Sequence, residues 1–189
     1  MAVIQYFAYG SNMLTARLQA RCASAQARSV VRVDDYKLSF FKKGRDGSGK
    51  AMTSKSAGGR VFGVVFDLDE SDLASLDRFE GVGQGYDRVG DFTAHNLDTG
   101  KPLDAVTYIA NPDFIVSDLK PYDWYLNLVI AGARHHALPS DYAMALTATP
   151  STADPEPDRP WRQEALELLA HDPEKWTPVF GKDRAQGKC

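Results

Sequence analysis

A glycine, a serine and an asparagine stand together near the start of the chain, where an apolar run changes into an amphipathic segment. The stretch reads "YFAYGSNM", from Tyr6 to Met13. A junction between a strand and a helix leaves the first backbone N–H groups of the helix without partners, and these suit a carboxylate or an oxyanion. Gly10 would let such a ligand approach the backbone closely. Ser11 or Asn12 could equally cap a helix that binds nothing, so this stretch alone does not predict a site.

A carboxylate continues the apolar face of a second expected helix, over residues 69–81, where Asp67 or Asp69 could be the cap. Leu73, Leu76 and Glu80 stand at positions i, i+3 and i+7 and therefore share one face of a helix. A carboxylate that is partly withdrawn from water is suited to general acid–base catalysis near neutral pH. The alternative is that the helix ends early and Glu80 turns into solvent.

The stretch from Gly44 to Lys50 matches the phosphate-binding pattern G-x-x-x-x-G-K. That pattern also needs a following Ser or Thr to bind magnesium and a helix whose amides face the phosphates. Position 51 is alanine, and the next residues, "MTSKSAGG", are poor helix formers. We therefore favour a surface loop and keep nucleotide binding as a minor hypothesis.

Composition excludes several classes of protein. The 189 residues are 43% hydrophobic and 25% charged, with a net charge of −3 and no basic block, which argues against a nucleic-acid partner. The longest apolar run, residues 126–133, is interrupted by Asn127 and is too short for a bilayer, so no membrane partner is expected. Two cysteines predict no disulfide framework and favour a cytoplasmic location. Four histidines at no familiar zinc spacing predict no metal site.

The order of apolar patterns predicts a mixed α+β domain, with a small barrel favoured over a doubly wound parallel sheet. Residues 1–149 form the expected main part of the domain, and residues 150–189 an extension of it with a linker, a peripheral helix and a loose tail. The expected strands cover residues 3–9, 30–41 (one or two strands), 60–68, 86–96 and 103–109. The expected helices cover residues 12–22, 69–81, 121–137, 139–148 and 161–170. Residues 42–59 are expected to form a long loop with at most one short strand.

Four motifs occur in an order that resembles the γ-glutamylcyclotransferase family and its AIG2-like fold. They are "YFAYGSNM", "GVVFDLDESDLASLDRFEGV" from Gly63 to Val82, the single Tyr86, and "AGARHHALPSDY" from Ala131 to Tyr142. The resemblance covers roughly residues 5 to 147. It implies a small mixed β-barrel flanked by helices, in which the short segment "GKAMTS" is a strand. It also implies an enzyme without a cofactor that converts a γ-glutamyl amino acid or γ-glutamyl amine to 5-oxoproline and a free amino acid or amine.

The resemblance assigns roles to particular residues. Glu80 would be the general acid and base, taking a proton from the α-ammonium group and giving it to the leaving nitrogen. Phe114 or Tyr125 would line the side of the pocket that receives the leaving group. The remaining substrate-binding residues that the resemblance implies are Tyr9, Gly10, Ser11, Asn12, Met13, Leu14 and Tyr86.

Some alternatives remain open at this point. The chain could be a non-catalytic module of the same fold that binds a small acid. Arg17 and Arg21 could add a positive field to the site or simply be solvated on a helix. The identity of the γ-glutamyl substrate, the formation of a homodimer and the role of residues 150–189 are not determined by the sequence.

Overall fold

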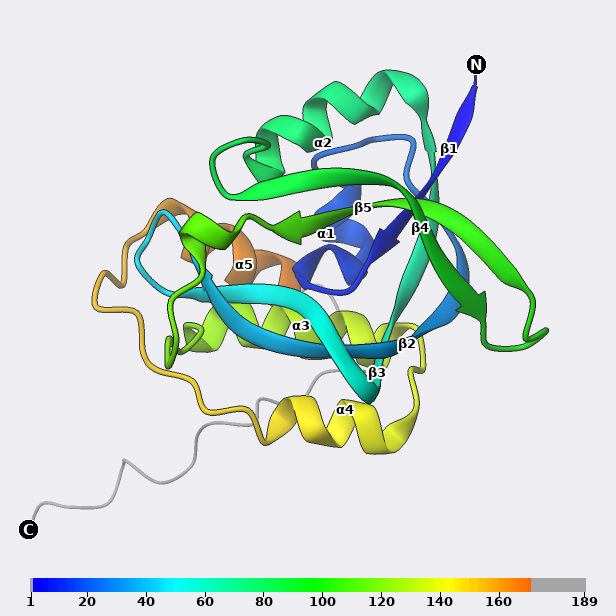
Figure 1. Ribbon diagram of the computed structural model, residues 1–189. Coiled ribbons are helices and arrows are strands. Elements are labelled where there is room, and N and C mark those ends of the chain that lie inside the picture. The colour runs from blue at the N-terminus through cyan, green and yellow to red at the C-terminus, as the bar shows by residue number, and fades with distance from the viewer. Residues whose placement is uncertain (1, 171–189) are drawn as a thin grey trace, which may run out of the picture.

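The computed structural model describes residues 2–170, so the loose tail expected at the end of the chain lies outside the described residues. Five strands close into a barrel in the order β1-β3-β2-β4-β5 (Figure 1). The β1–β5 pair is parallel and the other neighbouring pairs are antiparallel, which makes the barrel mixed, as predicted. The strands are β1 (Val3–Ala8), β2 (Gln26–Lys43), β3 (Gly49–Asp69), β4 (Tyr86–Asn96) and β5 (Pro102–Ala110).

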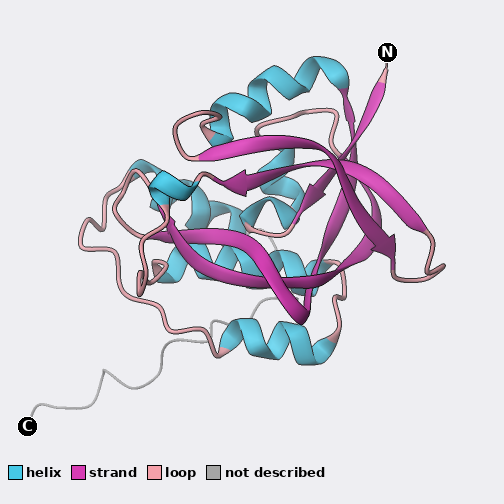
Figure 2. Ribbon diagram, viewed as in Figure 1, coloured by secondary structure: helices cyan, strands magenta, loops and turns pink. Residues whose placement is uncertain are grey.

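Helices flank the barrel, which confirms the predicted α+β class (Figure 2). In Figure 1, α2 lies on the opposite side of the barrel from α3 and α4. The α-helices are α1 (Thr15–Gln19), α2 (Leu73–Glu80), α3 (Asp123–His135), α4 (Ser140–Thr147) and α5 (Pro160–Ala170). Three short 3₁₀ helices are η1 (Ser11–Met13), η2 (Glu70–Asp72) and η3 (Pro112–Phe114). Among the described residues, no helix is both long and apolar enough to cross a bilayer.

The predicted long loop over residues 42–59 is wrong. Instead β2 and β3 pair along most of their length as one long antiparallel hairpin, with three register shifts. The Asp46 side chain accepts hydrogen bonds from the Ser48 backbone and from Lys50 in the connecting turn, where a phosphate loop would need free amides. No helix follows Lys50, because β3 continues to Asp69. The G-x-x-x-x-G-K stretch is therefore the turn of a hairpin. The glycines that suggested a loop lie at irregular positions of this hairpin.

The first predicted helix, over residues 12–22, is also different in the structure. The turn η1 is separated from α1 by Leu14, which has an extended backbone (φ −71°, ψ 109°). Neither Ser11 nor Asn12 caps a helix with its side chain. Both side chains instead make tertiary hydrogen bonds, which propensity rules applied to a single segment do not include.

Gly132 in α3 allows η1 to pack directly on that helix. A Cβ atom at this position would lie 2.6 Å from the backbone nitrogen of Leu14 and 2.8 Å from the backbone carbon of Met13. Contacts of this kind with backbone atoms cannot be relieved by a change of side-chain rotamer. The glycine therefore fixes where the Gly10–Met13 turn lies relative to the buried helix α3.

Replacing Gly132 with alanine is expected to destabilise the protein by about 1–3 kcal/mol, because the added methyl group overpacks this contact. Urea denaturation of the parent and variant measures the difference. Gly90→Ala is the matched control, since a Cβ atom there would meet nothing within 4 Å. Equal losses in the two variants would contradict the role given to Gly132.

Residues 150–170 pack back onto the start of α3. The backbone of Thr152 pairs with that of Pro121 and Asp123, and the Trp124 indole donates to Asp154 at 2.9 Å. Asp154 also accepts from Arg159 at the start of α5. The segment between α4 and α5 is thus held by specific hydrogen bonds.

His136, next to the end of α3, is packed between the η1–α1 region and the barrel. Its Nε2 lies 3.0 Å from the hydroxyl of Thr15, and its ring meets the Phe66 ring edge-on. Burial, helped by the neighbouring His135, lowers the pKa of His136 to about 4. The unfolded chain would titrate near the ordinary value of about 6.5.

Between pH 6.5 and 4 the unfolded chain therefore binds a proton at this position that the folded protein does not. The free energy of unfolding is expected to fall as the pH falls through this window. His136→Gln removes the titration, so its stability should fall less between pH 7 and pH 5 than that of the parent. Urea denaturation at both pH values tests this, and identical losses would contradict it.

Candidate active site

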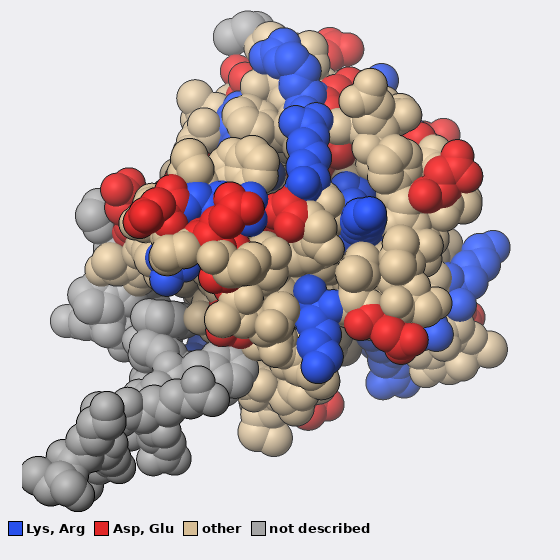
Figure 3. Space-filling model, turned by 90° about the vertical axis from the view of Figure 1, so that its left-hand side faces the viewer, with Lys and Arg blue, Asp and Glu red and all other residues tan. Residues whose placement is uncertain are grey.

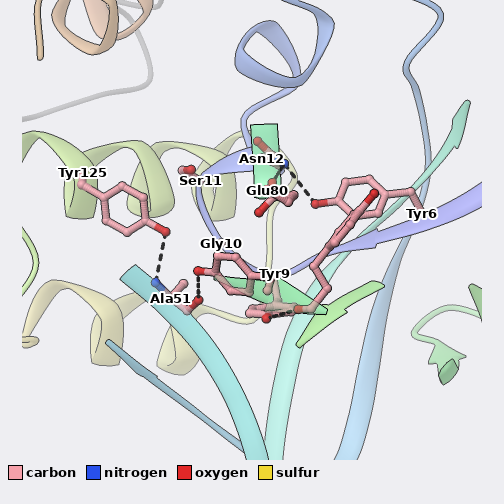
Figure 4. Close-up of a pocket in the computed structure, with 10 residues that line it drawn as sticks. Tyr6, Tyr9, Gly10, Ser11, Asn12, Ala51, Glu80 and Tyr125 are labelled. Atoms are coloured by element: carbon pink, nitrogen blue, oxygen red, sulfur yellow. Dashed lines mark hydrogen bonds between the residues drawn. The ribbon is translucent and has the colours of Figure 1, made fainter. Parts of the chain in front are cut away.

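A small pocket lies where the end of β1, the turn η1 and the end of α2 meet the start of β3 (Figure 4). Each of these elements brings at least one polar group to it, and α3 adds a tyrosine hydroxyl. Ten residues line the pocket: Tyr6, Tyr9, Gly10, Ser11, Asn12, Ala51, Glu80, Tyr86, Tyr108 and Tyr125.

Glu80 is the last residue of α2 and lines the pocket. The helix ends at Gly81, which has a left-handed backbone (φ 68°) and donates to the carbonyl of Asp77. The Glu80 side chain is 15% exposed, and Leu76 on the same helical face is fully buried. The alternative of an early helix end with Glu80 in solvent is therefore wrong.

Asn12 holds the Glu80 carboxylate in place. Its amide nitrogen donates to Glu80 Oε1 at 2.8 Å and to the Tyr6 hydroxyl at 3.0 Å. Its amide oxygen accepts from Arg21 at 2.9 Å, so the guanidinium decides which way the amide faces. Arg21 itself lies 3.7 Å from Glu80. The carboxylate thus sits among polar partners at the edge of an apolar face.

Two tyrosine hydroxyls bind the backbone of a single residue on the opposite wall. A register shift in the β2–β3 ladder between Ser39 and Lys42 leaves Ala51 without a strand partner. The Ala51 amide donates to the Tyr125 hydroxyl at 3.1 Å, and the Ala51 carbonyl accepts from the Tyr86 hydroxyl at 2.7 Å. The bulge therefore ties α3 and β4 to the pocket wall.

The tyrosines around the pocket keep their protons at neutral pH. Burial raises the pKa of Tyr6 and Tyr9 well above the ordinary value, and the negative charge of Glu80 raises both further. Burial also raises the pKa of Tyr86 and Tyr125. Among the described residues, Glu80 is the only carboxylate that lines the pocket, and no lysine or histidine does so. Apart from the tyrosines, which stay protonated, Glu80 is therefore the only acid–base side chain among the residues that line the pocket.

The turn itself offers backbone donors. Within it, the amides of Met13 and Leu14 donate to the carbonyls of Gly10 and Ser11. The amides of Ser11 and Asn12 come too early in η1 to find an acceptor inside the turn. Because α1 is only five residues long, the donors are individual amides and not the end of a long helix.

The structure brings most of the sequence-predicted site residues to one place. Tyr9, Gly10, Ser11, Asn12, Glu80, Tyr86 and Tyr125 all line the pocket. The side chains of Met13 and Leu14 do not line it and are buried instead. The sequence did not indicate Tyr6, Ala51 and Tyr108 as site residues, although Tyr6 lies within the "YFAYGSNM" stretch.

The sequence left Phe114 and Tyr125 as alternatives for the acceptor side. Tyr125 reaches the pocket, whereas Phe114 lines a neighbouring cleft. In the part of the chain that the structure describes, no group of three or more His, Cys, Asp or Glu side chains is placed to bind a metal ion.

The protein is thus a small closed mixed barrel in which one carboxylate and a Gly-Ser-Asn turn line the same pocket. Comparison with known proteins shows which family has this fold. The AIG2-like family matches residues 60–146. The gamma-glutamylcyclotransferases of Bos taurus and Homo sapiens are each 34% identical to the chain, over 149 and 148 residues, which is 76% of this chain and 77% of theirs.

A solved structure of a gamma-glutamyl cyclotransferase superposes with a TM-score of 0.78 at 28% identity, covering 88% of this chain and 99% of that one. The chain belongs to the γ-glutamylcyclotransferase family.

The Asn12–Tyr6 hydrogen bond is expected to contribute to stability. Asn12→Ala should lower the free energy of unfolding by about 1–3 kcal/mol, because it leaves buried polar partners unpaired. Tyr6→Phe removes only the phenolic oxygen, and the double variant completes a double-mutant cycle measured by urea denaturation. Strict additivity of the two single losses would show that this hydrogen bond contributes nothing.

Proposed function

We propose that the protein is a γ-glutamylcyclotransferase that acts at the Glu80 pocket. The free α-amine of a γ-glutamyl group attacks its own γ-carbonyl carbon, a five-membered ring closes, and the bond to the leaving nitrogen breaks. The products are 5-oxoproline and a free amino acid or amine. The observation that carries this proposal is the single carboxylate facing backbone donors in a pocket whose tyrosines stay protonated.

Each polar group has a place in this reaction. Glu80 takes a proton from the α-ammonium group, which frees the nucleophile, and returns it to the leaving nitrogen as the tetrahedral intermediate collapses. The amides of Ser11 and Asn12 donate to the α-carboxylate or to the oxygen of the intermediate. Asn12 and Arg21 keep the carboxylate oriented, and protonated tyrosines such as Tyr9 donate hydrogen bonds without competing for the proton.

One acid–base group is sufficient because nucleophile and electrophile belong to the same molecule. Binding the glutamyl chain in a curled conformation brings the amine to the carbonyl and supplies a large part of the rate. Gly10 favours such a curled ligand, since a Cβ atom there would lie 3.1 Å from Ala51 Cβ and would narrow the pocket.

The alternative is a binding module of the same fold without catalysis. The orientation of Glu80 by Asn12 argues against it, because binding an anion would not require a carboxylate in the pocket. A cytoplasmic location, glutathione metabolism and a homodimer remain predictions.

Glu80→Gln is expected to lower the release of 5-oxoproline from a γ-glutamyl dipeptide by about 10²–10⁴-fold, because the amide can accept no proton. Chromatographic measurement of 5-oxoproline tests this. Glu70→Gln is the matched control, since Glu70 is exposed in η2, outside the pocket.

Circular dichroism and thermal melting must show that both variants fold. Turnover by Glu80→Gln equal to that of the parent would refute the assigned mechanism. Tight dipeptide binding by the parent with no 5-oxoproline release would favour the binding module.

A further inference from the structure

A larger cleft adjoins the catalytic pocket. The two share Ser11, Glu80, Tyr86 and Tyr125, and the cleft extends from there past the β2–β3 turn to α5. A γ-glutamyl group bound in the pocket would direct its leaving group into this cleft, because the rest of the pocket is lined by the barrel and by the Gly10–Met13 turn. Residues of the cleft are therefore expected to recognise the released amine.

Positive charge is concentrated in the cleft, although the chain as a whole has a net charge of −3. Seven Lys and Arg residues line it, against four Asp and Glu residues. On the face seen in Figure 3, Lys and Arg side chains run through the middle and acidic side chains gather on either side. A lining with this excess of positive charge favours an anionic ligand.

Some of these cations already have partners within the protein. Arg21 donates to Asn12 beside Glu80, and Lys50 makes a 2.7 Å ion pair with Asp46. Their charges are thus largely used by the fold. Two further cations of the cleft are buried and make no ion pair shorter than 3.8 Å among the described residues.

Lys42, on β2, is one of these. The residue is only 7% exposed, and its ammonium lies 4.6 Å from the centre of the Tyr86 ring. Among the described residues, no carboxylate lies within ion-pair distance of it. Burial lowers the pKa of Lys42, although the charge of Glu80 opposes this effect. An ammonium on a largely buried side chain, next to a pocket tyrosine and without a carboxylate in ion-pair contact, favours an anionic ligand.

Arg17, on α1, is the other. It is 6% exposed, and its Nε donates to the hydroxyl of Ser11 at 3.2 Å. Its buried Nη1 has no hydrogen-bond partner in the described part of the chain. Glu164 is 3.8 Å from that nitrogen, too far for a hydrogen bond, and is itself half-exposed at the rim. A buried guanidinium nitrogen without a hydrogen-bond partner costs free energy, and an acceptor on a ligand in the cleft would remove that cost.

We propose that the cleft selects a γ-glutamyl conjugate whose leaving amine is a dicarboxylic amino acid, such as γ-glutamyl-glutamate. The inference rests on the proposed function and specifies the substrate class of the same site. Lys42 stands beside Tyr86 and Arg17 beside Ser11, so these two buried cations adjoin two different lining residues of the pocket. One carboxylate of the leaving group pairs with each. The ring closure is unchanged, and the released amino acid receives its proton from Glu80.

Three substrates test the proposal by kinetics: γ-glutamyl-glutamate, γ-glutamyl-alanine and γ-glutamyl-ethylamide, with two, one and no carboxylates on the leaving group. We expect kcat/KM to fall in that order, by about tenfold or more for each lost carboxylate, since a charge-assisted hydrogen bond is involved each time. Equal kcat/KM values for the three substrates would overturn the proposal.

Lys42→Gln is expected to lower the preference for γ-glutamyl-glutamate over γ-glutamyl-ethylamide by about tenfold, through KM more than through kcat. Lys55→Gln is the matched control, because Lys55 is an exposed lysine of β3 outside the cleft and the net charge changes equally. A preference that stays the same in Lys42→Gln, or that Lys55→Gln lowers as much, would overturn the role of Lys42.

Calorimetry with the Glu80→Gln protein keeps this test separate from the proposed function. That variant should bind γ-glutamyl-glutamate more tightly than γ-glutamyl-ethylamide by a factor similar to the kinetic one. Equal binding of the two, or binding of neither, overturns the inference whether or not the parent turns over. Selective binding together with no 5-oxoproline from any substrate overturns the proposed function and supports the charge selectivity.

Discussion

The site depends on one side-chain amide. Asn12 accepts from Arg21 on one side and donates to Glu80 and Tyr6 on the other, so a single planar group connects the segment after α1 with α2 and β1. An amide has a fixed arrangement of donors and acceptor. Because Arg21 binds the oxygen of the Asn12 amide, the N–H groups of that amide face Glu80. The position of the carboxylate is thereby coupled to the geometry of the turn that offers the backbone donors.

The barrel supplies this arrangement through two local departures from regular structure. Gly132 removes a side chain from α3 so that the Gly10–Met13 turn can lie against it. The bulge in the β2–β3 hairpin leaves the backbone of Ala51 for Tyr86 and Tyr125. In both places, ordinary packing or ladder hydrogen bonds are replaced by contacts that shape the pocket. Both irregularities therefore lie next to the site.

The proposed chemistry of the pocket and the proposed selectivity of the cleft depend on different physical effects. In the pocket, burial keeps the tyrosines protonated, which in the proposed reaction leaves proton transfer to Glu80. In the cleft, Lys42 and Arg17 are buried with no carboxylate closer than the 3.8 Å that separates Arg17 from Glu164, and they favour negative charge. In the proposed reaction, ring closure depends on the groups of the pocket, whereas recognition of the released amine depends on the cations of the cleft.

The sequence by itself predicted most of the helices and strands and most of the residues that line the pocket. Strong apolar periodicity predicted β1, β4, β5 and α3, and the "YFAYGSNM" and "LDRFEG" stretches indicated Glu80 and the turn, since local patterns report local structure. It predicted a loop where the long β2–β3 hairpin lies and capping roles for Ser11 and Asn12. Only the tertiary structure showed that both predictions were wrong. The hairpin is stabilised by cross-strand partners, and Asn12 binds residues as distant in the sequence as Glu80. The sequence likewise could not identify the cations of the cleft, which come together because α1 and β2 lie beside the same pocket. Whether a charged side chain has a counter-ion depends on the residues that surround it in the folded protein.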